Sequence, residues 1–377
     1  MADLLDEVLA DVRTLVECES PSADLAAVAR SAEVVARVGT ARLGVAPERI
    51  VLDGRTHLRW RLGPAPSRVL LLGHHDTVWP LGSLAEHPYG VEDGVLRGPG
   101  CFDMKVGLVM AFHAAAGLDG VTLLVTGDEE LGSPSSRELV EEEARAATAA
   151  LVLEASADGG ALKTERKGVS LYEVRVFGLA AHAGLEPERG VNATEELAHQ
   201  VLAVSALADP AAGTTVTATA ARAGTTTNTV PAAGSFAVDV RARTAAEQQR
   251  VHRAIGALAP ALPGARVEVA GGVNRPPLEA ASSAALHRRV LTIASRLGLP
   301  APGSAAVGGA SDGNFTAGVG TPTLDGLGAV GGGAHAADEH VLVGEVPGRT
   351  ALLRALVEEL LADSATPAPA APGHDHP

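Results

Sequence analysis

The sequence predicts an α/β protein with a mostly parallel sheet flanked by helices and a second, inserted α+β domain. Three short continuous apolar runs, at residues 67–73, 121–126 and 149–153, are typical of strands buried on both faces. Segments with helical spacing at about 104–118 and 134–147 separate these runs, which favours strand–helix–strand units with parallel pairing. A chain of 377 residues is also too long for one ordinary core, which predicts two domains.

The domain that contains this sheet also receives helices from both ends of the chain. Apolar residues recur at helical spacing in residues 3–17 and 24–43, with a break at Pro21 and Ser22. Beyond Arg275 we expect two more helices joined by glycine-rich loops, with the helices at 279–298 and 346–362 and the loops around Gly308 and Gly331. We therefore assign residues 1–167 and 275–363 to one discontinuous domain.

A different pattern begins after Lys167. Residues 169–177 alternate between apolar and polar side chains, as in a strand with one buried face. A helix, two strands, a helix and a strand are then expected, at 191–207, 214–222, 234–241, 244–258 and 265–270. This β-α-β-β-α-β order is that of a ferredoxin-like unit, so residues 168–274 are predicted to form the inserted domain. The segment 364–377 is predicted to be a disordered tail, although its two histidines could bind stray metal.

Composition excludes several classes of protein. The net charge is −15 and the isoelectric point is near 5.3, which argues against nucleic acid or anionic membranes as partners. The two cysteines, Cys18 and Cys101, are too few for a disulfide framework or a thiolate zinc site. The acidic first residues and the lack of a long uncharged apolar run lead us to expect a soluble, cytoplasmic protein.

Potential metal ligands follow the predicted strands. In open α/β sheets ligands bind beyond the carboxyl ends of the strands, and His74, the pair Glu129–Glu130, and Glu154 each follow one apolar run. Asp103 lies between a Gly/Pro-rich loop and an apolar helical segment. Because a carboxylate has two oxygens, Asp103 could bridge two cations. With His335, which follows a flexible glycine-rich stretch, these residues predict a two-metal site.

Each of these residues also has a simpler interpretation. His74, His75 and Asp76 could form an ordinary turn at the end of a strand. However, Asp76 points the same way as His74 and could accept the proton of its second ring nitrogen, whereas His75 points oppositely and is expected to be structural. Glu129 and Glu130 could be a solvated acidic turn, but adjacent carboxylates also diverge enough for one to bind metal while the other faces the attacking water.

The last two candidates differ in how well a simpler interpretation accounts for them. Glu154 is hard to explain without a partner, because an unpaired carboxylate beside a core is costly. His335 is ambiguous when it is considered alone.

Six motifs together resemble the bacterial glutamate carboxypeptidase family of di-zinc metallopeptidases. The wider relatives of that family include acetylornithine deacetylase, succinyl-diaminopimelate desuccinylase and aminoacylase. The motifs occur in order along the chain: GHHDTV at 73–78, GPGCFDMK at 98–105, TGDEE at 126–130, AHAG at 181–184, GGASDG at 308–313 and GAHAADE at 333–339. The set of five ligands and a base is highly specific, whereas any one motif is not.

The resemblance implies a co-catalytic di-zinc hydrolase that cleaves an amide bond. It implies two divalent metal ions per chain, with zinc expected and cobalt or manganese as alternatives. The implied roles are one metal held by His74 and Glu154, the other held by Glu130 and His335, Asp103 as the bridge, Asp76 orienting His74, and Glu129 as general base. The resemblance also implies a cis peptide bond after Asp103.

The substrate follows less directly from the sequence. Matching positions in the carboxypeptidase branch contact the substrate, so Arg241, Arg275 and Asn228 are candidate substrate-binding residues, and an arginine could bind an α-carboxylate in a bidentate way. Arg241 could equally be an ordinary surface residue at a strand end. We expect a metallocarboxypeptidase that releases a C-terminal amino acid, with glutamate as the first candidate, from a peptide or N-acyl conjugate. The alternatives are an N-acyl-amino-acid deacylase and an inactive family member that binds small molecules.

The resemblance further implies a homodimer that forms through the inserted domain. In that arrangement His182 would reach the partner's active site and stabilise the tetrahedral oxyanion. An open edge strand in a small sheet is a natural place for a second copy to pair. A local role for His182 in its own turn remains the alternative.

Overall fold

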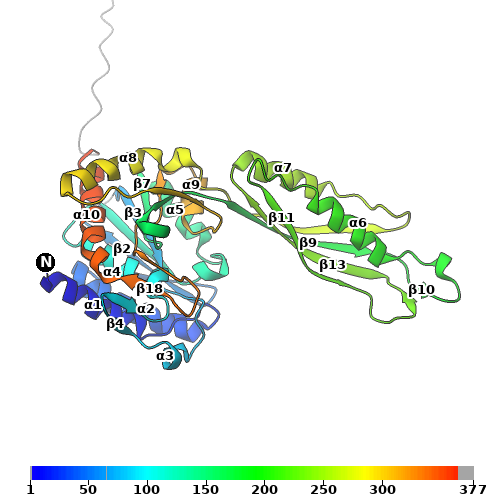
Figure 1. Cartoon of the computed structure of the whole chain (residues 1–377), viewed down its shortest axis with the longest axis horizontal. Helices are drawn as coiled ribbons and strands as arrows, with labels where there is room; N and C mark the ends of the chain where they lie inside the picture. The colour runs from blue at the N-terminus through cyan, green and yellow to red at the C-terminus, as the bar shows by residue number, and fades with distance from the viewer. Residues whose placement is uncertain (1, 65, 364–377) are drawn as a thin grey trace, which may run out of the picture. The chain divides into compact units, whose positions relative to one another are not determined.

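The computed structural model describes residues 2–64 and 66–363 (Figure 1). The predicted tail at 364–377 lies outside the described residues. By density of contacts the chain divides into two compact units. Unit 1 comprises the chain up to residue 164, residues 282–305 and the chain from residue 319, and unit 2 comprises residues 165–281 and 306–318. The segment 306–318 therefore belongs with unit 2.

Unit 1 is built on a six-stranded mixed sheet with the order β1-β2-β6-β3-β7-β16. The strands are β1 Glu48–Leu52, β2 Arg55–Leu62, β6 Val121–Thr126, β3 Val69–His74, β7 Ala149–Val152 and β16 Thr323–Leu324. β6, β3, β7 and β16 are mutually parallel, whereas β2 runs antiparallel to β6 and β1 antiparallel to β2. The predicted α/β class with a mostly parallel sheet is confirmed, and β1 and β2 are additional antiparallel strands.

Helices cover this sheet because the parallel strands are apolar on both faces. Every residue of β3, β6 and β7 is buried. The longer helices of unit 1 are α1 Ala2–Val16, α2 Leu25–Leu43, α4 Val106–Ala115, α5 Arg137–Ala146, α8 Ala280–Leu297 and α10 Val346–Asp363. α4 is buried almost all round because it packs against β3, α1, α2 and α10, and Phe112 of α4 meets Trp60 of β2 edge to face.

Several smaller elements lie outside the six-stranded sheet. A four-stranded antiparallel sheet has the order β17-β18-β5-β4, with β4 Gly90–Glu92, β5 Val95–Arg97, β17 Gly331–Gly332 and β18 His340–Leu342. The short helix α3 Ser83–Glu86 precedes β4, and strands β8 Leu162–Arg166 and β15 Ser304–Val307 pair with each other. These short elements were not predicted from periodicity.

Unit 2 is an antiparallel sheet with two long helices packed on it (Figure 1). The strand order is β11-β13-β9-β14, formed by β11 Thr215–Ala223, β13 Ala233–Ala242, β9 Gly168–Phe177 and β14 Arg266–Arg275. Helices α6 Ala193–Ser205 and α7 Ala245–Gly256 share a core with this sheet, and the short helix α9 Gly313–Gly318 belongs to the same unit. The elements occur in the predicted β-α-β-β-α-β order, with a small ladder between β10 Ala181–His182 and β12 Thr229–Val230 added.

Among the described residues, no helix combines the length and the apolar character needed to cross a bilayer.

Candidate metal centre

Five side chains from distant parts of the sequence converge in unit 1. His74 Nε2 lies 3.3 Å from Asp103 Oδ1 and 3.5 Å from Glu154 Oε1. His335 Nε2 lies 3.3 Å from Asp103 Oδ2 and 3.2 Å from Glu130 Oε2. The two oxygens of Asp103 therefore face two different histidines, each of which has a second carboxylate beside it.

The register of the parallel strands explains half of this convergence. His74 is the last residue of β3 and pairs with Thr126 at the end of β6. Leu72 pairs with Val152, so that Glu154 emerges from β7 at the level of His74. Because parallel strands end at one edge of the sheet, the side chains that follow them meet there.

The other ligands come from irregular backbone. Asp103 lies in the turn Cys101–Lys105, where its own backbone angles are not helical, and the peptide bond after Asp103 is cis, as the resemblance implied. His335 has a φ of 63°, in the left-handed region, and follows β17 in the glycine-rich loop. Glu129 and Glu130 begin a short 3₁₀ turn at Glu129–Leu131, directly after β6.

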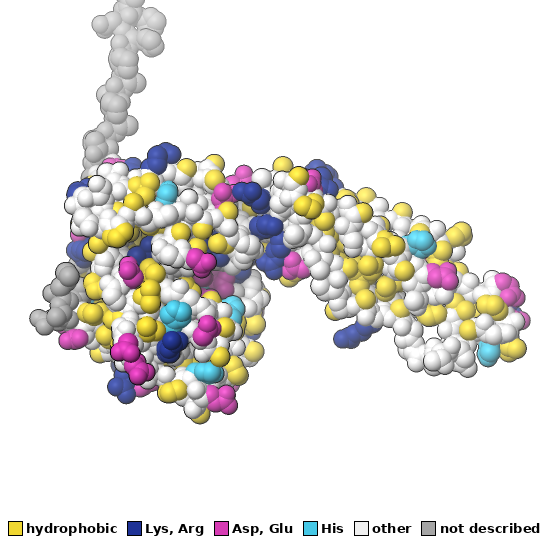
Figure 2. Space-filling model, in the orientation of Figure 1, with side chains coloured by type: hydrophobic (Ala, Val, Ile, Leu, Met, Phe, Trp, Pro, Cys, Tyr) yellow, Lys and Arg dark blue, Asp and Glu magenta, His cyan; other side chains and the backbone are white. Residues whose placement is uncertain are grey.

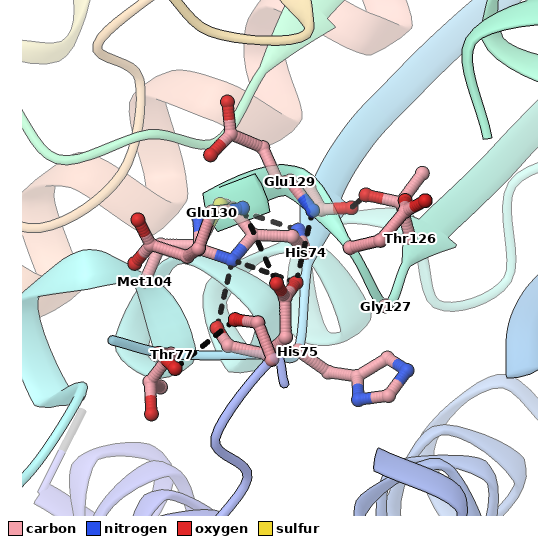
Figure 3. Close-up of polar contacts among 12 residues, drawn as sticks. His74, His75, Thr77, Met104, Thr126, Gly127, Glu129 and Glu130 are labelled. Carbon is pink, nitrogen blue, oxygen red and sulfur yellow. Dashed lines mark hydrogen bonds and ion pairs between the residues drawn. The ribbon is translucent and has the colours of Figure 1, made fainter. Parts of the chain in front are cut away.

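Asp76 holds the turn that carries the two glutamates. Its fully buried carboxylate accepts hydrogen bonds from the backbone N–H of Glu129 at 3.3 Å and of Glu130 at 3.2 Å (Figure 3). His74 Nδ1 lies 2.9 Å from the backbone oxygen of Asp76 and 3.5 Å from its carboxylate. The closest acceptor for this ring nitrogen is thus the carbonyl of Asp76, which leaves Nε2 directed at Asp103 and Glu154.

His75 is directed away from this group (Figure 3). Its ring nitrogens contact Ser31 Oγ at 3.1 Å and the Thr56 carbonyl at 3.0 Å. Burial lowers the pKa of His75 to about 4, so the ring is neutral at physiological pH. These contacts agree with the structural role expected for this residue.

The carboxylates create an environment around both candidate ligand histidines that stabilises positive charge. Hydrogen bonds with Asp103 and Glu130 raise the pKa of His335 to about 10. Burial alone would lower the pKa of His74, but hydrogen bonds with Asp103 and other carboxylates outweigh it, and the pKa lies well above its ordinary value. Burial also raises the pKa of Glu130, whereas the two imidazoles bring the pKa of Asp103 below its usual range despite burial. A cluster with these properties favours a bound cation.

The donor set fits divalent metal ions. Two groups of candidate donor atoms each lie within 4.8 Å of one another, His74 with Glu129 and Glu154, and His74 with Asp103 and Glu130. In the described part of the chain, the buried Oε1 of Glu130 has no hydrogen-bond partner, as expected for an oxygen left for a ligand. Imidazole and carboxylate donors suit zinc, cobalt or manganese. The side chains of His74, Asp103, Glu130, Glu154 and His335 would hold the metals.

Glu129 is well placed to act on a substrate at this cluster. Its carboxylate is buried and belongs to the same donor group as His74 and Glu154. Its neighbour Glu130 instead contacts His335. Both glutamates therefore border the cluster, each with a donor atom within 4.8 Å of one of His74, while Glu130 also contacts His335.

Sequence reasoning assigned no role to three other residues near the site. Asp128 accepts hydrogen bonds from Ser135 N at 2.8 Å and from the hydroxyls of Ser135 and Ser136 at 2.6 Å and 2.5 Å. His57 Nδ1 accepts the N–H of Gly127 at 3.1 Å. Glu339 is buried and accepts several N–H groups from the loop that carries Asp103. The only available signal was that Asp128 and Glu339 lie inside two of the motifs.

A pocket of about 530 Å³ lies beside Glu339 in unit 1. Figure 2 shows histidine and acidic side chains among hydrophobic ones on the face of unit 1 that carries β18 and α3. The ring of Trp79 packs edge to face on His87, with centroids 5.1 Å apart, and both rings line the pocket. Ala337 also lines it, so the pocket borders the segment that supplies His335.

The four remaining candidates lie in unit 2. His182 is exposed in β10, and Ala183 N donates to the carbonyl of Asn228, so these two candidates share one hairpin. Arg241 is partly exposed and forms a bidentate pair with Asp239, at 2.8 Å and 2.9 Å.

Arg275 has the surroundings of a structural residue. It is buried, lies 3.3 Å from the carboxylate of Asp312, and packs over the ring of Phe315. The structure thus gives Arg275 partners within unit 2.

Comparisons with known proteins agree with this combination of fold and site. The model of peptidase family M20/M25/M40 matches residues 70–359. Carboxypeptidase G2 from Pseudomonas sp. strain RS-16 is 31% identical over 295 residues, which cover 74% of this chain and 70% of that protein. The chain belongs to peptidase family M20/M25/M40 and is a metal-dependent hydrolase of that family, distantly related to carboxypeptidase G2.

Solved structures share the fold across almost the whole chain. Aminopeptidase PepT from Bacillus cereus superposes with a TM-score of 0.73 at 21% identity, covering 95% of this chain and 99% of that one. An M20 family metallo-carboxypeptidase from Sulfolobus solfataricus gives a TM-score of 0.71 at 15% identity, covering 94% and 99%. A dinuclear metal-binding peptidase of the M20 family from Bacillus subtilis gives 0.65 at 12% identity, covering 96% and 99%.

Proposed function

We propose that the protein is a metallocarboxypeptidase that hydrolyses the amide bond preceding a C-terminal amino acid, with glutamate as the first candidate. The observation that carries the proposal is the pair of oxygens of Asp103, one facing His74 and the other facing His335. The relationship to carboxypeptidase G2 supports release of an amino acid with a free carboxylate.

The residues of the centre divide the chemistry between them. Two divalent metal ions held by the five ligands would supply Lewis acidity to an attacking water and to the amide carbonyl. Glu129 takes a proton from the water at its carboxylate and delivers it to the leaving nitrogen. Asp76 keeps Glu129 in place through the hydrogen bond to its backbone N–H. The low exposure of Glu129 limits competition from bulk water.

Recognition of the substrate's carboxylate is assigned to unit 2. Arg241 is the better placed of the two arginines because its guanidinium is partly exposed and its present partner, Asp239, is one that a substrate carboxylate can displace or share. Asn228 belongs to the hairpin that carries His182 and can add a polar contact.

The proposal includes a homodimer in which His182 acts in the partner's site. Support comes from the tautomer that its surroundings select. His182 Nδ1 accepts the backbone N–H groups of Gly184 and Leu185, each at 3.1 Å. The ring proton is therefore on Nε2, and the exposed ring offers this N–H to an oxyanion.

A substrate panel tests the reaction. Purified protein loaded with zinc is incubated with N-acyl glutamates, N-acyl ornithines and dipeptides, and released amino acids are quantified. We expect release of glutamate from acyl glutamates, whereas a preference for acyl ornithines would favour the deacylase alternative. Glu129→Gln is expected to retain both metals and lose nearly all turnover. Full activity in this variant, or one metal per wild-type chain by elemental analysis, would contradict the mechanism.

Mixed dimers test the contribution of His182. Chains with Glu129→Gln and chains with His182→Ala are each expected to be nearly inactive. After subunit exchange, a subunit with intact Glu129 receives an intact His182 from its partner, so one site per mixed dimer recovers. No recovery, with exchange verified by differently tagged chains, would show that His182 acts within its own chain or not at all.

A further inference from the structure

Glu339 accepts four hydrogen bonds through its two carboxylate oxygens. Oε1 accepts the backbone N–H groups of Phe102 and Asp103, at 2.9 Å and 3.0 Å. Oε2 accepts the N–H of Gly100 at 2.9 Å and the indole N–H of Trp79 at 2.6 Å. The residue is only 3% exposed. A buried carboxylate with this many donors is strongly constrained in position.

The segment that Glu339 binds cannot supply these hydrogen bonds itself. Gly100 has a φ of 71°, and Asp103 has a φ of −115°, so the backbone is not regularly helical there. The carboxylate of Glu339 takes the place of backbone acceptors for three loop amides, those of Gly100, Phe102 and Asp103. A single side chain therefore sets the path of the backbone that carries Asp103.

Glu339 is also tied to His335. The N–H of Glu339 donates to the carbonyl of Ala336 at 3.0 Å, and Ala336 N donates to Gly333 at 2.9 Å. These two turns join Glu339 to the loop in which His335 adopts its positive φ. The same segment thus presents one proposed ligand and holds the loop of another.

We propose that Glu339 is a positioning residue that sets the geometry between Asp103 and His335 and so controls the affinity of the metal held by Asp103, Glu130 and His335. This inference rests on the proposed two-metal centre. The other metal depends less on Glu339, because His74 and Glu154 are placed by β3 and β7. Loss of the Glu339 carboxylate should therefore lower the affinities for the two metals unequally.

Glutamine cannot replace this glutamate. Each oxygen of Glu339 faces two N–H donors. In either orientation of a glutamine amide, its NH₂ group would meet two donors instead of accepting from them. We expect the glutamine NH₂ group to face the N–H donors of Gly100 and Trp79. A Trp79→Phe substitution would then remove one of the two donors that oppose it.

The test is a titration of metal-free protein with Co²⁺, followed by visible absorption and competition with a chelator, at a temperature where each variant is folded. Wild type is expected to bind two equivalents. In Glu339→Gln the affinity for one equivalent should fall about 10- to 100-fold, as is usual when a residue supporting a ligand is lost, while the other changes much less. Glu345→Gln, an exposed glutamate of the same unit, is the matched control and should titrate like wild type.

A further variant, Trp79→Phe, keeps the test decisive if Glu339→Gln does not fold, and a double variant extends the test where Glu339→Gln does fold. Trp79→Phe leaves three of the four N–H donors to Glu339. It should lower the affinity for the same Co²⁺ equivalent by a smaller factor than Glu339→Gln does. In the double variant Trp79→Phe/Glu339→Gln, the fold-loss of affinity for this equivalent should be smaller than the product of the two single fold-losses, because one donor that opposes the glutamine NH₂ group is gone.

Hydrolysis by Glu339→Gln should recover at high Co²⁺ with an unchanged KM. Two equivalents bound with wild-type affinities in Glu339→Gln or Trp79→Phe would overturn the inference, as would a lower melting temperature with unchanged metal binding. Failure of wild type to bind two equivalents would instead overturn the metal centre on which the inference depends.

Discussion

Gly107, in the first turn of α4, lies so close to Leu153 that a Cβ atom on Gly107 would be 2.2 Å from the Leu153 carbonyl oxygen. Gly328 approaches the same oxygen from the loop after β16, also with a Cβ distance of 2.2 Å. Glu154 is the next residue in the chain. Two glycines thus enclose the backbone from which this proposed ligand emerges, because only glycine permits such a close approach.

The first prediction is that Gly107→Ala displaces Glu154. The added methyl group must push against backbone rather than a flexible side chain, so we expect a loss of about 1–3 kcal/mol in the free energy of unfolding. The metal that Glu154 contacts should also bind more weakly. Gly344→Ala is the control, because a Cβ there meets nothing within 4 Å. Urea unfolding and metal analysis measure both effects, and equal results for the two variants would contradict this role of Gly107.

The second prediction separates the two arginines proposed to bind the substrate's carboxylate. Arg241→Ala should leave the fold intact and reduce the preference for a free-acid substrate over its amide by about 2–4 kcal/mol in transition-state binding. Arg275→Ala should instead destabilise unit 2 by about 3 kcal/mol, because Asp312 loses a buried partner. Ratios of kcat/KM for paired substrates and thermal unfolding provide the measurements. An unchanged acid preference in Arg241→Ala would weaken the carboxypeptidase assignment.

The third prediction concerns Arg349, a buried arginine in α10. It donates to three backbone carbonyls, those of Gly160, Gly326 and Gly328, and burial lowers its pKa to about 10. Arg349→Met would leave these carbonyls without their donor, so we expect a loss of about 2–4 kcal/mol in the free energy of unfolding. The exposed Arg296, paired with Glu359 at 3.3 Å, is the comparison, and Arg296→Met should cost about 0–1 kcal/mol. Similar losses from both substitutions would refute the role of the buried guanidinium.

The fourth prediction is a pH dependence of stability that arises from His57. Burial lowers the pKa of His57 in the folded protein, although Asp128 and Asp76 act in the opposite direction. The unfolded chain, in which histidine titrates near about 6.5, therefore binds a proton at a pH where the folded chain does not. Protons then favour unfolding, so the contribution of His57 is intact above about pH 6.5 and is lost as the pH falls toward the folded pKa.

Replacement of His57 with glutamine should make stability fall less steeply between about pH 7 and pH 5. Chemical unfolding at several pH values measures the slope for each protein. His75, whose pKa burial lowers to about 4, continues to contribute in the variant, so the slope should decrease without vanishing. Parallel curves for wild type and His57→Gln would exclude this contribution.

The elements that could be predicted from sequence are those whose pattern follows directly from burial. β3, β6 and β7 are apolar throughout because helices cover both faces of a parallel sheet, and their ends therefore located His74 and Glu154. β2 was missed because polar residues interrupt its pattern: His57 is buried through specific partners, and Arg59 pairs with Glu143. Hydrophobic periodicity does not reveal specific contacts of this kind.

The sequence by itself determined the chemistry that is available: two imidazoles and several carboxylates positioned after buried strands, in the motif order of a metallopeptidase family. Only the tertiary structure decided which atoms meet. Asp76 was expected to orient His74; its carboxylate lies 3.5 Å from His74 Nδ1, and it also accepts the backbone N–H groups of Glu129 and Glu130, which the sequence did not suggest. Glu339 had no predicted role, because its partner Asp103 lies 236 residues earlier in the chain. Local spacing defines which side chains share a strand or helix face, whereas contacts between distant segments depend on how the whole domain packs.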